Sequence, residues 1–230
     1  MTPTTPMTQD RSGGRPDRMR FDGWIAGLGT AAGVRLVVGY WPLSPLGAFA
    51  DVMVERADGR RVLLAPSERV AEFVAATYRF DDIVICPVTV EPGRERWTVA
   101  AGPLRLTFEP GPSTALGRLL RLVPGRLATS PGWAALCDVP ARLLMPGVRT
   151  RGSAGGGRRE WYAARDLRSI ATAGATWDGA DLGELRPVRP PVRFGFGSVP
   201  RRPSLTRVVT TVELARERRR GRGQASKRSV

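Results

Sequence analysis

The pattern of apolar and polar positions changes its period several times along the chain. The run WIAGLGTAAGVRLVVGYW, residues 24–41, begins with unevenly spaced apolar residues and ends in a β-branched stretch at residues 33–38. Because the two halves have different periods, the run predicts a short helix followed by a strand. Arg35 and four glycines lie inside it, so we do not expect it to span a membrane.

The segment ADVMVERADGRRVLLAP, residues 50–66, carries the clearest local signal in the chain. Two β-rich runs flank Asp58-Gly59, a pair that suits the φ > 0 positions of a type I′ hairpin turn. The sequence therefore predicts strands near residues 50–57 and 60–65, joined by a tight turn.

Further segments have helical periodicity behind a polar cap. Ser67 is expected to cap a helix with an apolar face formed by Val70, Phe73, Val74, Thr77 and Tyr78. Ser113 is expected to open a second helix, which Pro124-Gly125 ends. Ser130-Pro131 predicts the start of a third helix, since serine at the cap followed by proline is the usual order.

Short β-rich runs make up much of the remaining chain. Strands are expected within residues 81–92, 94–102 and 103–111, two more within 160–179, and a closing pair at 192–199 and 204–214. Short turns between consecutive strands favour antiparallel pairing, and the helices fall in separate blocks. The expected fold class is α+β, a mostly antiparallel sheet with about three to four helices in separate blocks.

Composition and charge define the expected domain boundaries. The 230 residues suit one domain at residues 21–214, and its ends, residues 1–20 and 215–230, are polar enough to be disordered. The formal net charge is +15, and the tail contributes much of it. The basic residues of the tail are Arg216, Arg218, Arg219, Arg220, Arg222, Lys227 and Arg228.

Absent residue types exclude several chemistries. There is no histidine, which is the usual base near neutral pH and the commonest metal ligand. Lys227 is the only lysine, and the two cysteines, Cys86 and Cys137, form no CxxC motif, so we expect no metal site and no cofactor. Sparse cysteines without a targeting signal favour a reducing, cytoplasmic location for a soluble protein.

The Gly-rich segment TRGSAGGGRREWYAARD, residues 150–166, is the main candidate for binding. It lacks the GxxxxGK[ST] and GxGxxG patterns of nucleotide sites. Two interpretations remain open: a flexible connection, or a loop whose backbone N–H groups and guanidiniums hold an anion. We expect a loop at residues 151–157 and a strand that begins near Arg159 or Glu160. The candidate ligand residues are Arg149, Arg151, Gly152, Gly155, Gly156, Gly157, Arg158 and Arg159, with Trp161 and Tyr162 as an apolar wall.

Three function classes follow, in order of preference. The first is a soluble binding domain for a small anionic or amphipathic ligand near this loop. The second is non-specific nucleic-acid binding through the basic tail. The third is an enzyme that uses carboxylate and arginine chemistry, although no catalytic residue is assigned. The ligand, the oligomeric state and the pathway stay open.

Two stretches carry a resemblance to known proteins. SPLGAFADVMVERADGRRVLLAP and RTRGSAGGGRREWYAARDLRSI resemble uncharacterised conserved hypothetical proteins of actinobacterial type, which implies no chemistry. The order of hairpin, helix and later strands is also faintly similar to acetoacetate-decarboxylase-like β folds, with no shared motif. The Schiff-base lysine of that activity has no counterpart here, so the similarity implies a fold and not decarboxylation.

Deletion of residues 215–230 is expected to leave the melting temperature unchanged, because nothing in this tail is patterned for burial. The deletion should also weaken binding to a polyanion such as heparin, with a smaller loss at high salt. Differential scanning calorimetry and heparin affinity chromatography measure the two effects. Melting several degrees lower after the deletion would show that the tail packs on the domain.

Overall fold

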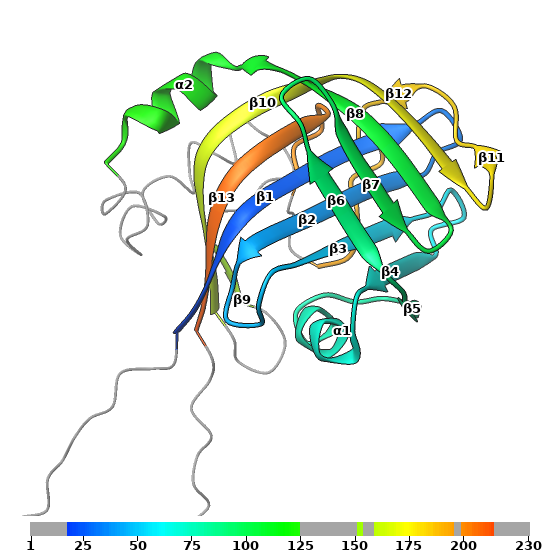
Figure 1. Cartoon of the computed structure of the whole chain (residues 1–230), viewed down its shortest axis with the longest axis horizontal. Helices are drawn as coiled ribbons and strands as arrows, with labels where there is room; N and C mark the ends of the chain where they lie inside the picture. The colour runs from blue at the N-terminus through cyan, green and yellow to red at the C-terminus, as the bar shows by residue number, and fades with distance from the viewer. Residues whose placement is uncertain (1–17, 125–150, 154–158, 196–198, 214–230) are drawn as a thin grey trace, which may run out of the picture.

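The structure is a computed structural model that describes residues 18–124, 151–153, 159–195 and 199–213. Within these residues the chain forms one large sheet with the strand order β5-β4-β3-β2-β1-β13-β10-β8-β7-β6. Its strands are β1 (Arg18–Thr30), β2 (Arg35–Leu43), β3 (Phe49–Glu55), β4 (Arg61–Ala65), β5 (Asp82–Ile85), β6 (Val88–Pro92), β7 (Trp97–Ala101), β8 (Leu104–Ser113), β9 (Arg151–Ser153), β10 (Arg159–Trp177), β11 (Ala180–Asp181), β12 (Leu185–Arg186) and β13 (Ser204–Glu213). The sheet curls so that β6, β7 and β8 cross over β1, β2 and β3, which gives a half-barrel (Figure 1).

The expected fold class of α+β with three to four helices is wrong. The described residues contain only two helices, α1 (Glu68–Ala75) and α2 (Ala115–Leu122), beside a dominant sheet. The antiparallel expectation fits, apart from the parallel pair β4–β5. The helix expected after Ser130 lies outside the described residues. No helix in the described part of the chain is long and apolar enough to cross a bilayer.

The start of the run at residues 24–41 is a strand and not a helix. Glycines at alternate positions of β1 conceal its period of two. A Cβ on Gly27 would lie 2.6 Å from the Val199 side chain, and a Cβ on Gly29 would lie 2.5 Å from the Pro187 carbonyl oxygen. The segment that follows β12 therefore presses directly on this face of β1, where only glycine fits.

The strands β1 to β4 are buried on both faces along much of their length. On the inner side of the curl, Leu36, Val52 and Leu64 pack with Trp97 and Phe108 in one apolar cluster. On the opposite face a second cluster packs under α1 and includes Val188, Phe194 and Val199 from the late part of the chain. Burial on both sides explains why these strands are near-continuous apolar runs instead of alternating ones.

The hairpin between β3 and β4 is confirmed, but its turn type differs from the expectation. Gly59 has φ +88°, whereas Asp58 is not among the residues with positive φ. The Gly59 N–H donates to the Arg56 carbonyl oxygen, and the Arg56 N–H donates to the Arg60 carbonyl oxygen, each at 2.9 Å. This is a three-residue loop with glycine in the left-handed region, and not a type I′ turn.

Two further strand predictions need correction. Residues 160–179 contain one long strand, β10, instead of two separate strands, and it has register shifts at Ala164/Asp166, Arg168/Ile170 and Ile170/Thr172. These bulges bend the strand, so that it pairs with β13 along its first part and with β8 along its second. Residues 192–195 form no strand, although Phe194 is buried in the core, so the described part of the expected 192–199 segment does not pair with β13.

Both described helices begin at capped residues. The Ser67 side chain accepts a hydrogen bond from the Val70 N–H, as expected. The cap of α2 is Thr114 and not Ser113, with its hydroxyl accepting from the Gly117 N–H at 3.0 Å. The hydroxyl of Ser113 instead contacts Asp166 at 3.1 Å.

A buried ion pair joins the hairpin to the late part of the chain. Glu55 is fully buried and lies 2.9 Å from the Arg35 guanidinium, which is also buried. Arg193 donates to the same carboxylate through its backbone N–H at 2.7 Å and its Nε at 3.0 Å. These contacts satisfy a charge that would otherwise be costly to bury, since an isolated buried carboxylate is strongly disfavoured.

Gly59→Val is expected to lower the free energy of unfolding by about 1–2 kcal/mol, because a β-branched residue is strained at φ +88°. Urea unfolding followed by circular dichroism measures the change. Gly174→Ala is the control, because its Cβ meets nothing closer than 3.8 Å, and it should be neutral or stabilising. Equal losses in both variants would contradict the turn geometry.

Candidate functional site

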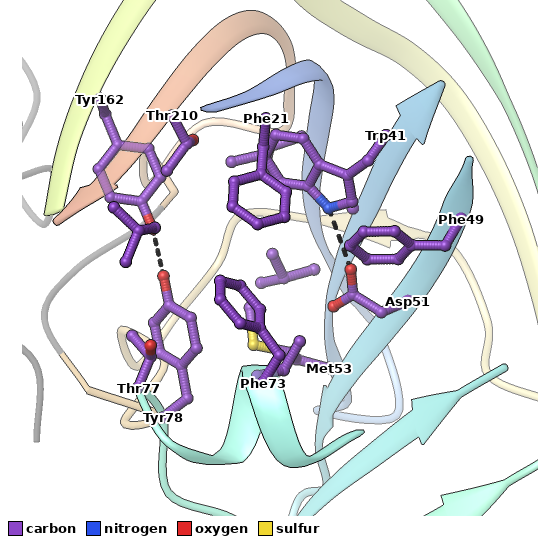
Figure 2. Close-up of a pocket in the computed structure, with 15 residues that line it drawn as sticks. Phe21, Trp41, Phe49, Asp51, Met53, Phe73, Thr77, Tyr78, Tyr162 and Thr210 are labelled. Atoms are coloured by element: carbon purple, nitrogen blue, oxygen red, sulfur yellow. Dashed lines mark hydrogen bonds between the residues drawn. The ribbon is translucent and has the colours of Figure 1, made fainter. Parts of the chain in front are cut away.

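A largely apolar pocket lies between α1 and the face of the sheet formed by β3, β2, β1, β13 and β10 (Figure 2). Its cavity volume is about 60 Å³. It is lined by Phe21, Ile25, Val37, Gly39, Trp41, Phe49, Asp51, Met53, Phe73, Val74, Thr77, Tyr78, Tyr162, Thr210 and Val212. Apolar pockets with a few convergent polar groups are the usual form of small-molecule sites.

Strand register assembles the floor of this pocket. Phe21 on β1 pairs with Thr210 on β13, which in turn pairs with Tyr162 on β10. Gly39 on β2 pairs with Asp51 on β3. Residues far apart in sequence therefore come together on one face, as directly paired positions do.

Four aromatic rings occupy the centre of the pocket. The ring of Phe21 lies 6.0 Å from that of Trp41 and 6.3 Å from that of Phe49, with nearly perpendicular planes. The rings of Phe21 and Phe73 lie 4.9 Å apart at an interplanar angle of 31°. The two edge-to-face contacts of Phe21 contribute stabilisation beyond the burial of apolar surface and favour fixed orientations of the rings.

Asp51 is the only acidic side chain among the described residues of the lining. It is 5% exposed, and its Oδ1 accepts a hydrogen bond from the Trp41 indole N–H at 3.1 Å. Burial raises the pKa of Asp51 to about 7, and the weaker opposing effect is the hydrogen bond from Trp41. A carboxyl group that changes charge near neutral pH inside a pocket is typical of functional sites.

Gly39 provides the space that this polar pair needs. A Cβ at position 39 would lie 2.5 Å from Asp51 Oδ1 and 2.6 Å from Trp41 Nε1. Neither atom could keep its position beside a larger residue. The glycine thus keeps the carboxylate and the indole N–H in contact next to the cavity.

The opposite side of the pocket carries hydroxyl groups. The Tyr78 and Tyr162 hydroxyls are hydrogen-bonded to each other, and Tyr78 reaches the site from the end of α1 (Figure 2). Thr210 is 5% exposed, and its Oγ1 is buried without a hydrogen-bond partner. A buried hydroxyl without a partner is uncommon and suits a site that is completed by a ligand or by water.

A second hollow lies at the surface near the β3–β4 turn and is lined by Asp58, Gly59, Arg60, Arg61, Asp81 and Arg193. Its guanidiniums already have acidic partners: Arg61 Nη2 lies 2.8 Å from Asp81 Oδ1, and Arg193 contacts Glu55. The hydrogen bonds from Arg61 lower the pKa of Asp81 to about 2. This hollow is a paired, exposed charge network, so the aromatic pocket is the stronger candidate.

The structure describes only some of the ligand residues that were predicted from the sequence. Arg149, Gly155, Gly156, Gly157 and Arg158 lie outside the described residues, as does the whole basic tail. Arg151 and Gly152 belong to β9 and not to a loop, which corrects the expected loop boundary, whereas β10 begins at Arg159 as expected. Arg151 pairs with Trp161, and Arg159 pairs with Ser153.

Of the expected apolar wall, Tyr162 lines the aromatic pocket and Trp161 does not. Successive strand residues point to opposite faces, which separates the two side chains. Asp51 and most of the aromatic lining are not among the site residues predicted from the sequence. One signal was available, because Asp51 is the one charged residue within FADVMV, an otherwise apolar strand segment.

Comparison with known proteins gives only distant similarities. No family model matches the chain, and no curated protein sequence does. Among solved structures, acetoacetate decarboxylase from Legionella pneumophila is similar at 8% identity, over 93% of this chain and 96% of that one, with a TM-score of 0.40. This is the faint likeness that the element order suggested.

A second solved structure, a protein from Nitrosomonas europaea provisionally named AttH, is similar at 12% identity with a TM-score of 0.34. The match covers 95% of this chain and 59% of that one. Neither similarity is strong enough to carry an argument about ligand or chemistry, which therefore comes from the pocket itself.

The stability of the protein is expected to depend on pH through Asp51. Because its pKa is raised to about 7, the folded chain binds a proton between about pH 4 and 7 that the unfolded chain has lost. This group therefore lowers the free energy of unfolding as the pH rises through that range, by roughly 4 kcal/mol in total. Asp51→Asn removes this dependence, so the stability of the variant relative to wild type should increase from pH 4 to pH 8.

Urea unfolding at a series of pH values measures the difference between the two proteins. Thr210→Val changes the same pocket without removing a carboxyl group, so it should retain the pH dependence of the wild type. Parallel stability curves for wild type and Asp51→Asn would show that the Asp51 pKa is not raised.

Proposed function

We propose that this protein binds a small amphipathic molecule in the aromatic pocket between α1 and the sheet. The observation that carries the proposal is the combination of an apolar cavity with polar groups on both sides of its rings. Asp51 and Trp41 lie on one side, and Thr210 and the tyrosine pair lie on the other (Figure 2). Such an arrangement would bury an apolar body and orient it through a few hydrogen bonds.

The size of the pocket supports a compact ligand. Its floor residues, such as Phe21 and Met53, are buried, whereas Thr77 and Tyr78 at the rim are only partly buried. A cavity accommodates one water per roughly 10–15 Å³ of such volume, so about 60 Å³ corresponds to a few waters. A molecule with one ring and a short polar substituent fits this scale, with its outer part at the rim.

The Gly/Arg-rich segment remains part of the proposal. Because β9 pairs with the start of β10, Arg151 lies next to the strand that carries Tyr162. Contacts from this segment to an anionic group of the ligand stay a prediction. Nucleic-acid binding through the tail also stays a prediction, since those residues lie outside the described ones.

The expected result for a simple probe, 2-phenylethanol, is stabilisation of the wild-type chain. At a concentration ten times its Kd, binding adds about 1.4 kcal/mol to the free energy of unfolding, which raises the melting temperature by roughly 3–6 °C for a protein of this size. Thr77→Trp should abolish the shift, because an indole at the rim would occupy the entrance.

Differential scanning fluorimetry and isothermal titration calorimetry measure this binding. Glu72→Trp is the matched control, because Glu72 is an exposed residue of α1 that does not line the pocket. The control should bind the probe as the wild type does. The proposal fails if the probe binds Thr77→Trp and wild type equally, or binds neither.

A further inference from the structure

The charge of the pocket differs from that of the rest of the chain. The chain has 36 basic residues, yet none of them is among the described residues that line this pocket. The titratable side chains of the lining are Asp51, Tyr78 and Tyr162. Asp51 is the one carboxyl group among them, so its ionisation gives the described lining a negative charge.

The surroundings of this carboxylate are aromatic. Figure 2 shows the Asp51 side chain directed toward the interior of the pocket, beside Trp41 and Phe49 and facing Phe73. The rings of Trp41 and Phe49 lie 6.5 Å apart at 38°, and Phe21 stands nearly perpendicular to both. Ring faces attract cations through their quadrupole, most strongly for tryptophan.

The carboxylate is also held in place on the wall of the pocket. The Trp41 N–H fixes Oδ1, and glycine at position 39 lets both groups pack against the strand, because a Cβ there would lie 2.5 Å from Oδ1 and 2.6 Å from Nε1. The aromatic rings and Met53 give this part of the pocket no other full charge to pair with the carboxylate.

We infer that the ligand of this pocket is an organic cation, a protonated amine on a small apolar body, with its ammonium group between the Asp51 carboxylate and the aromatic rings. This inference rests on the proposed function and names the class of its ligand. The apolar body of the ligand lies along Phe21 and Phe73 toward the hydroxyl groups. An anionic ligand in the same position would be repelled by Asp51, and no basic side chain among the described lining residues would compensate this repulsion.

The energetics of Asp51 support this class of ligand. Burial disfavours the ionised carboxylate, and no charged side chain of the described residues contributes to its pKa. An ammonium group within hydrogen-bond reach supplies the missing partner, and a charge-assisted hydrogen bond is stronger than a neutral one. The net charge of +15 repels cations at long range, but salt at physiological strength screens charges beyond about 8 Å.

Three probes of the same shape test the inference on the full-length chain: 2-phenylethylamine, 2-phenylethanol and phenylacetate. At pH 8 the amine is protonated and Asp51 is mostly ionised. Isothermal titration calorimetry should give an affinity for the amine at least about tenfold above that for the alcohol, which corresponds to about 1.4 kcal/mol. Phenylacetate should bind most weakly.

Asp51→Asn should remove the preference for the amine and leave the affinity for the alcohol within about twofold, since the amide has the same shape without the charge. Glu72→Gln, which removes an exposed carboxylate of α1, should keep the preference. In the wild type, the affinity for the amine should rise between pH 5.5 and 8 as Asp51 loses its proton, and the affinity for the alcohol should not. This profile tests the inference even if Asp51→Asn does not fold.

The outcomes separate this inference from the proposed function. If the alcohol binds at least as tightly as the amine, or if the affinity for the amine is independent of pH, the inference of a cationic ligand is wrong. The proposed function then still stands, because the pocket binds a small molecule. If Asp51→Asn keeps the preference, Asp51 does not recognise the cation. If none of the three probes binds the wild type, both the inference and the proposed function fail.

Discussion

The strands β1 to β4 must bury both of their faces, and the rest of the structure depends on this constraint. The inner face is covered when the sheet curls and brings Trp97 and Phe108 over Leu36 and Leu64. The outer face is covered by α1 and by the segment that follows β12. Burial of apolar surface, which contributes roughly 25 cal/mol per Å², stabilises the packing on both faces. The long, bulged β10 connects the two halves of the sheet.

The packing on the outer face of the sheet determines which strand positions must be glycine. Gly27 and Gly29 are required where the late segment contacts β1, and Gly39 is required where Asp51 meets Trp41. The aromatic pocket lies beside α1, in the part of this face where the helix and the sheet do not fill the space between them. The site thus results from the same packing that stabilises the fold.

Two buried carboxyl groups of β3, Asp51 and Glu55, have different partners. Glu55 is paired with Arg35 and Arg193, so its charge is compensated and it joins three parts of the chain. Asp51 has an indole N–H as a hydrogen-bond donor, and among the described residues no charged neighbour affects its pKa. The difference in partners, and not the difference in burial, separates a structural carboxylate from one that is suited to a ligand.

The sequence by itself determined features that depend on neighbouring residues. The Asp58-Gly59 hairpin, the helix behind Ser67 and the start of β10 at Arg159 follow from local backbone preferences, and the structure confirms each of them. Even there, the type of the 58–59 turn was wrong, since several turns accept the same residues. The absence of histidine excluded the commonest catalytic base and metal ligand without any structure.

Only the tertiary structure decided the role of β1 and the location of the pocket. The glycines of β1 conceal its period, because their spacing reflects contacts with Pro187 and Val199 and not a preference of the local chain. Asp51, Tyr162 and Thr210 line one pocket through the register of strands that are distant in sequence, and Tyr78 reaches it from the end of α1. Period and composition describe a strand and its turns, but the pairing of strands is decided by which faces can be buried together.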